Sequence, residues 1–169
     1  MRQIRNGVFE TNSSSMHSLV IRSDEVIEGD IYLTQDEIDK EVKLYMHKKD
    51  TFNDFEKDWY FGRAPFMIMS SFVEKWKYAY SSYAYDESKQ DELVKLLKEL
   101  SPQVKKFVPP EYCGTDDALL DSWLKKANID LKEFLTNKKY IIICDGDEYC
   151  IWEDMKKSGI IDTAAFEEI

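Results

Sequence analysis

Hydrophobic residues gather in short runs at both ends of the chain. Residues 19–21 (Leu-Val-Ile) and 140–143 (Tyr-Ile-Ile-Ile) are apolar and rich in β-branched side chains, which predicts strands. Residues 3–10 and 31–33 are predicted as further short strands. Asp145-Gly146, which follows the late run, favours a type I′ hairpin turn, because Asp and Gly tolerate the positive φ angles of that turn.

Between these ends, apolar residues recur at steps of three or four, which predicts helices. The first helix follows Thr34, where Thr-Gln-Asp-Glu fits a capping box: the Thr34 hydroxyl accepts from a first-turn N–H and Glu37 reaches back. The longest helix is predicted from Pro65, because proline suits the first helical turn. Further caps are predicted at Ser88, Thr115 and Asp130.

The longest helical segment is rich in aromatic residues. Its apolar positions form one broad stripe, made of Met69, Phe72, Val73, Trp76, Tyr80 and Tyr83. Tyr78 and Tyr85 fall outside that stripe and are predicted to be exposed, either to solvent or to a partner.

Together these elements predict an α+β fold with one domain over residues 1–169. We expect N- and C-terminal strands to form a small antiparallel sheet, covered by three or four helices from the middle of the chain.

Charge narrows the choice of partners. The chain has 33 acidic and 23 Lys or Arg residues, which gives a formal net charge of −10. Binding a nucleic-acid duplex requires a basic face to neutralise phosphates, and no Lys/Arg cluster in the sequence is large enough, so direct duplex binding is not expected. A local anion site built from backbone N–H groups and hydroxyls remains open.

Three cysteines, Cys113, Cys144 and Cys150, have spacings unlike a zinc site, which favours reduced thiols in a cytosolic protein. Cys144 and Cys150 are expected to pack as small apolar side chains. No apolar run approaches the ~18 residues of a membrane span, and the N-terminus lacks a signal-peptide core. A soluble protein without a membrane partner is therefore expected.

The candidate site lies near the N-terminus, where polar residues crowd between two predicted strands. Hydroxyl, amide and imidazole groups there can donate and accept hydrogen bonds, and an arginine on a flanking strand can bind phosphate or carboxylate. The alternative is an ordinary serine-rich turn. The predicted ligand-binding residues are Arg5, Glu10, Asn12, Ser13, Ser14, Ser15 and His17.

The stretch from Arg5 through Ser18, Arg-Asn-Gly-Val-Phe-Glu-Thr-Asn-Ser-Ser-Ser-Met-His-Ser, resembles the N-terminal signature of a group of uncharacterised proteins of phages and prophages of Gram-positive bacteria. Residues 134–148 are similar to a later segment of that group. The resemblance implies a phage-type protein in the host cytoplasm, without implying an activity. Residues 12–17 are also similar to a stretch of glutamine synthetases, which would make His17 a metal ligand.

Three functions follow as hypotheses. The first is an accessory protein that binds a phosphorylated small molecule or nucleotide through the serine-rich loop. The second is an acidic inhibitor of a host nucleic-acid or defence enzyme, in which carboxylates imitate phosphates. The third is a small metal- or nucleotide-dependent enzyme that uses Glu10 and His17. The sequence identifies no cofactor.

Overall fold

The structure is a computed structural model that describes residues 16–22, 27–53, 58–61, 67–115, 120–145 and 157. It has the predicted α+β class. The helices are α1 (Gln35–Leu44), α2 (Phe72–Ser82), α3 (Glu87–Leu100), α4 (Leu120–Ala127) and α5 (Leu131–Thr136). The strands are β1 (Met16–Ile21), β2 (Met46–Lys48), β3 (Thr51–Phe52), β4 (Asp58–Tyr60), β5 (Met67–Met69), β6 (Lys106–Phe107), β7 (Tyr112–Gly114) and β8 (Tyr140–Asp145).

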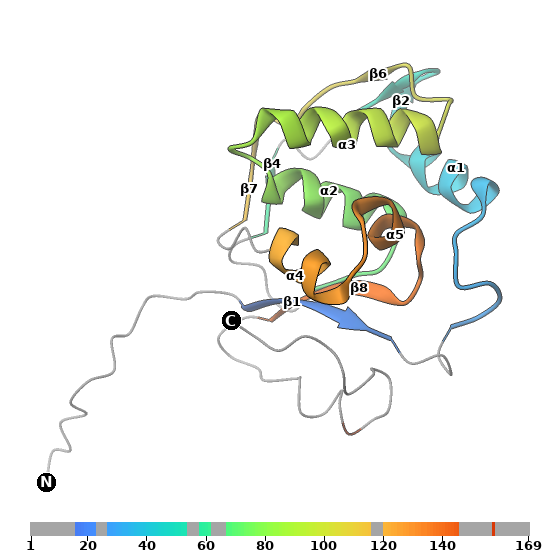
Figure 1. The fold of residues 1–169 in the computed structure, drawn as a ribbon. Coiled ribbons are helices and arrows are strands. Elements are labelled where there is room, and N and C mark those ends of the chain that lie inside the picture. Colours follow the sequence, from blue (N-terminus) through green and yellow to red (C-terminus); the bar gives the residue numbers. More distant parts are fainter. Residues whose placement is uncertain are drawn as a thin grey trace, which may run out of the picture.

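The largest sheet joins the two ends of the described chain (Figure 1). Its strand order is β1-β8-β5 and both pairings are antiparallel, with Leu19 opposite Ile142 and Met69 also opposite Ile142. All three side chains are buried. The predicted pairing of N- and C-terminal strands is thus confirmed, whereas β5 was predicted to be helical. Residues 146–156 lie outside the description, so the hairpin at Asp145-Gly146 stays a prediction.

Two smaller sheets were not predicted. In the sheet β2-β3-β6, β2 and β3 are antiparallel and β3 and β6 are parallel. Strands β4 and β7 form a parallel pair. These strands have two or three residues each, which is too short for a recognisable alternation of polar and apolar positions.

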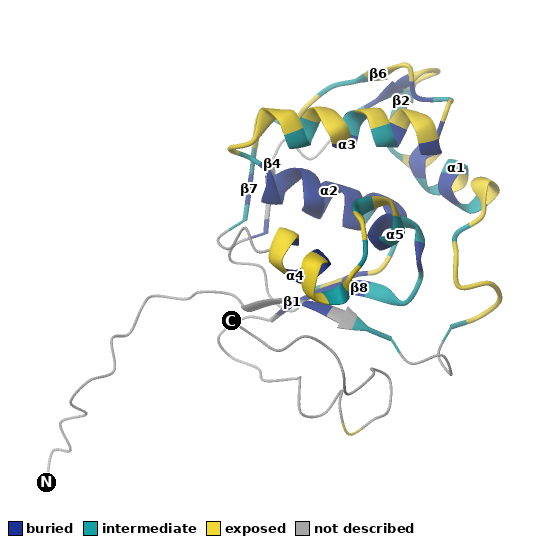
Figure 2. Cartoon of the chain, in the orientation of Figure 1, coloured by how far each residue is buried: buried dark blue, intermediate teal, exposed yellow. Residues whose placement is uncertain are grey.

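Helix α2 occupies the centre of the molecule, with the other helices and the main sheet around it (Figure 1). Ten of its eleven residues are buried, and most of the helix is dark blue in Figure 2. Tyr78 has no exposed surface, so its predicted exposure was wrong: a helix enclosed on all sides has no solvent face. Tyr85 lies beyond the helix and is fully exposed, as predicted.

The start of α2 corrects the position predicted from Pro65. Ser71 caps the helix: its hydroxyl accepts from the Glu74 backbone N–H at 3.2 Å, and the Glu74 carboxylate accepts from the Ser71 N–H at 3.1 Å. This capping box satisfies two backbone donors that a helix leaves unpaired. Residues 67–69 therefore form β5, and Pro65 lies outside the described residues.

The other predicted caps have mixed outcomes. The Thr34–Glu37 capping box on α1 is confirmed, and Asp130 caps α5 by accepting from the Glu133 N–H. Asp86, rather than Ser88, caps α3: its carboxylate accepts from the Lys89 N–H at 3.2 Å, and Ser88 lies within the first turn of the helix. The residues between Thr115 and α4 lie outside the description, so Thr115 stays a prediction.

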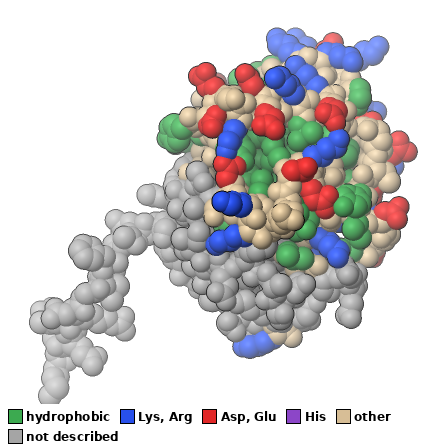
Figure 3. Space-filling view, in the orientation of Figure 1, with side chains coloured by type: hydrophobic (Ala, Val, Ile, Leu, Met, Phe, Trp, Pro, Cys, Tyr) green, Lys and Arg blue, Asp and Glu red, His purple; other side chains and the backbone are tan. Residues whose placement is uncertain are grey.

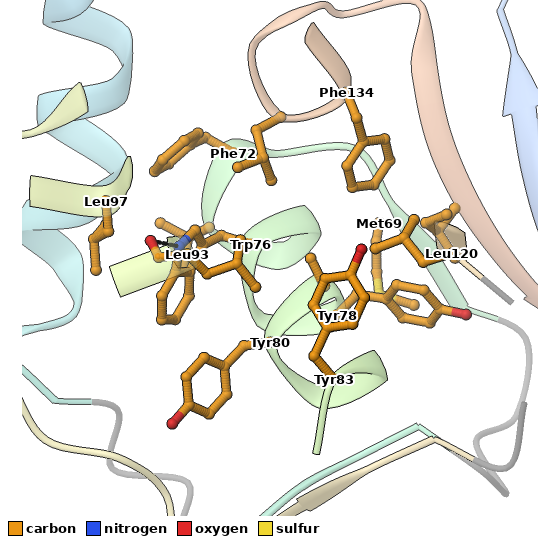
Figure 4. Close-up of a cluster of buried hydrophobic side chains, with 14 of the residues drawn as sticks. Met69, Phe72, Trp76, Tyr78, Tyr80, Tyr83, Leu93, Leu97, Leu120 and Phe134 are labelled. Atoms are coloured by element: carbon orange, nitrogen blue, oxygen red, sulfur yellow. Dashed lines mark hydrogen bonds between the residues drawn. The ribbon is translucent and has the colours of Figure 1, made fainter. Parts of the chain in front are cut away.

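Aromatic rings fill the space between α2 and its neighbours (Figure 4). Trp76 stacks on Tyr80 with ring centroids 5.3 Å apart. Its indole Nε1 donates to the Leu93 carbonyl of α3 at 3.0 Å, the hydrogen bond that is dashed in Figure 4. The bond satisfies a polar atom in an otherwise apolar contact and fixes α3 over α2.

Candidate functional site

The N-terminal candidate site lies largely outside the described residues. This applies to Arg5, Glu10, Asn12, Ser13, Ser14 and Ser15. The backbone of His17 belongs to β1 and pairs with Cys144 of β8; its side chain is not described. Met16, the first residue of β1, lies opposite Asp145, the last residue of β8. Its convergence into a site stays a prediction.

A different candidate site is a groove of about 420 Å³ between α3 and the segment that contains β6. It lies across the molecule from β1, on the side where α3 and β6 are seen in Figure 1. Ten residues line it: Tyr80, Glu87, Gln90, Asp91, Val94, Lys98, Lys105, Lys106, Phe107 and Pro109. Charged, amide and aromatic groups therefore meet in one groove.

One face of helix α3 forms one wall of the groove. The lining residues Glu87, Gln90, Asp91, Val94 and Lys98 follow helical steps of three or four, which places them on one side. Eleven steps at 1.5 Å each give a wall of about 16 Å. Carboxylates stand at its N-terminal end and a lysine at its C-terminal end, so the wall changes from acidic to basic along its length.

Two aromatic side chains line the groove between these ends. The rings of Tyr80 and Phe107 meet edge to face at 5.2 Å. Tyr80 is buried, whereas Phe107 is half-buried and packs edge-on against Trp76 at 5.3 Å. Burial raises the pKa of Tyr80 to about 12, with Cys113 and Asp91 adding to the effect. The phenol therefore keeps its proton at neutral pH and remains a hydrogen-bond donor.

Gln90 links the groove wall to the elements behind it. Its side-chain amide donates to the Tyr80 carbonyl at 3.2 Å and contacts the Cys113 sulfur at 3.7 Å. Burial raises the pKa of the Cys113 thiol, although the Gln90 hydrogen bond opposes the shift. A protonated, half-buried thiol is a poor nucleophile, so Cys113 acts here as packing.

The basic end of the groove carries Lys98, Lys105 and Lys106. The Lys105 ammonium donates a hydrogen bond to the Pro102 carbonyl at 2.6 Å. Within the described chain, neither Lys98 nor Lys106 forms an ion pair with a carboxylate. All three side chains are exposed. They leave positive charge available at one end of the groove.

The groove lining combines carboxylate, amide, ammonium and aromatic side chains, which are groups that can bind a ligand. The lining residues include no histidine, serine or cysteine. Across the described ranges, no group of three or more His, Cys, Asp or Glu residues is placed to hold a metal ion. None of the described helices has the length and apolar character needed to cross a membrane.

No family model, curated protein or solved structure matches this chain. The resemblance of residues 5–18 to phage proteins therefore stays a prediction, and the groove is interpreted from its own chemistry.

Two ionisable residues that connect helices, Lys75 and Glu41, were missed in the sequence. Lys75 of α2 has no exposed surface, and its ammonium donates to the carbonyls of Phe134 (2.8 Å) and Asn137 (2.9 Å) at the end of α5. Burial lowers the pKa of Lys75 to about 7, partly opposed by Glu41. Lys75 thus joins α2 to α5, because the last carbonyls of a helix lack intrahelical donors.

Glu41 of α1 completes this link. Its carboxylate accepts from the Val73 N–H at 3.2 Å, in the first turn of α2. Burial raises the pKa of Glu41, and the hydrogen bonds from Val73 and Phe72 act against the shift. No sequence pattern marks these two residues, because each occupies a position that looks like an ordinary polar site on a helix.

Proposed function

We propose that the protein binds a phosphorylated small molecule of nucleotide size in the groove along α3. The observation that carries this proposal is the exposed trio Lys98, Lys105 and Lys106 at one end of a groove with an aromatic middle. Lysine ammonium groups bind phosphate as point charges. Their position on an otherwise acidic chain favours a ligand with its negative charge concentrated at one end.

The remainder of the groove has the groups to bind the base and sugar of a nucleotide. A flat ring can pack beside Phe107 and Val94, since small-molecule sites are largely apolar with a few orienting polar groups. The carboxylates of Glu87 and Asp91 accept hydrogen bonds from amino or ring N–H groups. The wall of about 16 Å matches an elongated ligand with a donor edge at one end and phosphates at the other.

We expect binding without turnover. The test is isothermal titration calorimetry with ATP, GTP, CTP, UTP and inorganic phosphate. At least one nucleotide should bind, and Lys98→Gln should weaken it about 10-fold or more, since a hydrogen bond to a charged group contributes about 1.5–3 kcal/mol.

Lys95→Gln is the matched control. Lys95 lies on the same helix and is exposed, but it does not line the groove. The substitution changes the net charge equally, and we expect a change in affinity of no more than roughly twofold. Equal effects of the two substitutions, or no binding of any nucleotide, would contradict the proposal.

The serine-rich N-terminal segment is the alternative location for the same ligand class. His17→Ala distinguishes the two, because β1 and the groove lie on different sides of the molecule (Figure 1). If His17→Ala abolishes nucleotide binding and Lys98→Gln leaves it unchanged, the ligand belongs to the N-terminal segment. The reverse result places it in the groove.

A further inference from the structure

Two pairs of adjacent lysines, far apart in the sequence, lie side by side in the fold. Lys48 ends β2 and Lys49 follows it, whereas Lys105 and Lys106 lead into β6. The parallel pairing of β3 with β6 brings them together: the backbone N–H groups of Lys105 and Lys106 both donate to the Asp50 carbonyl, at 2.8 and 3.0 Å. We call these four residues the lysine surface.

The strand register places Lys48 and Lys106 on the face of the sheet opposite Phe52 and Phe107. Thr51 of β3 lies opposite Lys48 on one side and Lys106 on the other, and directly paired residues project on the same face of a sheet. Phe52 and Phe107, one residue further along, pack instead against the aromatic core. Adjacent strands are about 4.8 Å apart, so Lys48 and Lys106 stand on either side of Thr51; Thr51 itself is buried, whereas both lysine side chains are exposed.

The charge of the surface is open to a partner. All four lysines are exposed, and none of them forms an ion pair with a carboxylate in the described part of the chain. Asp50 is the acidic residue within the turn, where its carboxylate accepts from the Thr51 hydroxyl at 3.3 Å. Figure 3 shows Lys and Arg side chains gathered at the top of the molecule, over β2 and β6. The sign of the local charge is therefore opposite to that of the whole chain.

We propose that the lysine surface binds the phosphate backbone of single-stranded nucleic acid. A protein partner would take its affinity from buried aromatic and aliphatic anchors, and none of the exposed large hydrophobic residues of the described chain lies in β2, β3 or β6. Phosphates bind lysine ammonium groups, which this surface supplies. A flexible single strand can follow a small curved face, whereas a rigid duplex would also meet the acidic surface around it.

This inference does not depend on nucleotide binding in the groove. Lys105 and Lys106 belong to both sites, but Lys48 and Lys49 do not line the groove, and Lys98 does not belong to the sheet. Substitutions at these unshared positions therefore separate the two proposals.

The experiment is fluorescence anisotropy with labelled oligo(U) and oligo(dT) of about 20 nucleotides, longer than the ~4–16 nucleotides of a typical site. Four phosphate contacts on a single strand predict a slope of about −2.8 for the logarithm of the binding constant against the logarithm of salt. Between 50 and 200 mM salt, affinity should then fall about 50-fold. Lys48→Gln/Lys49→Gln should halve the slope, giving a fall of about 7-fold over the same range.

Lys125→Gln/Lys126→Gln is the matched control, because these adjacent lysines are also exposed but lie at the end of α4. This variant and Lys98→Gln should keep the wild-type slope. Circular dichroism confirms that each variant is folded. The proposal is overturned by no binding at 50 mM salt, by equal losses in the α4 control, or by a polyglutamate peptide that displaces the oligonucleotide as well as unlabelled oligonucleotide does.

Discussion

Replacing Lys75 by methionine should change how the stability of the protein depends on pH. Burial holds the pKa of Lys75 at about 7, against an ordinary value of 10.5. Between these values the unfolded chain carries a proton on this residue and the folded protein does not. The free energy of unfolding of the wild type therefore rises with pH through this window.

The size of the effect follows from the shift. Each pH unit well inside the window contributes about 1.4 kcal/mol. Folded Lys75 is half-protonated near pH 7, so the gain between pH 7 and 9 is about 2 kcal/mol. In Lys75→Met this gain is absent. Other groups, including Cys144, whose pKa burial raises to about 12, titrate in both proteins and cancel in the difference.

Urea denaturation at pH 7, 8 and 9 measures this difference. Val73→Ala on the same helix is the control: it removes buried apolar atoms without changing a titratable group, so its curve should run parallel to that of the wild type. In the wild type, the NMR signal of the Lys75 side chain should titrate with a midpoint near 7. Parallel curves for wild type and Lys75→Met, or an NMR midpoint near 10.5, would refute the reasoning.

Three further outcomes are expected. Ser71→Ala should lower the free energy of unfolding by about 1 kcal/mol in urea denaturation, because it removes the cap of α2. Trp76→Phe should cost about 1 kcal/mol more than Trp59→Phe, since the Trp76 Nε1 pairs with a carbonyl and that of Trp59 has no hydrogen-bond partner; equal losses would contradict this. Cys144 has no exposed surface, so a thiol reagent at pH 8 should label it, as seen by mass spectrometry, only as fast as the protein unfolds.

Local signals in the sequence located the elements that depend on local interactions. The capping box at Thr34 and the cap at Asp130 involve residues only three positions apart, so the local sequence is enough to predict them. Ser71 and Glu74 have the same spacing, yet Pro65 and the apolar residues after it favoured an earlier start for the helix. The decisive fact was that residues 67–69 pair with β8, and a pairing across the chain leaves no local trace.

The candidate sites likewise depend partly on the local sequence and partly on contacts between distant segments. The groove combines one face of α3, whose periodicity is visible in the sequence, with Lys105 and Lys106, whose approach depends on the parallel pairing of β3 and β6. A count of charges found no basic cluster, because each lysine pair by itself is unremarkable. Lys75 could not be recognised as buried before α2 was known to be enclosed on every side.

The central position of β8 in the main sheet has a consequence for how the protein is made. Ile21 pairs with Tyr140, so roughly 120 residues are synthesised between the partners, which takes about 6–24 s at 5–20 residues per second. Strand β5 also pairs with β8, so both outer strands emerge from the ribosome before the strand that joins them. During this interval their backbone donors and acceptors are open to other strands, and a chain that stops before residue 140 leaves both edges permanently unpaired.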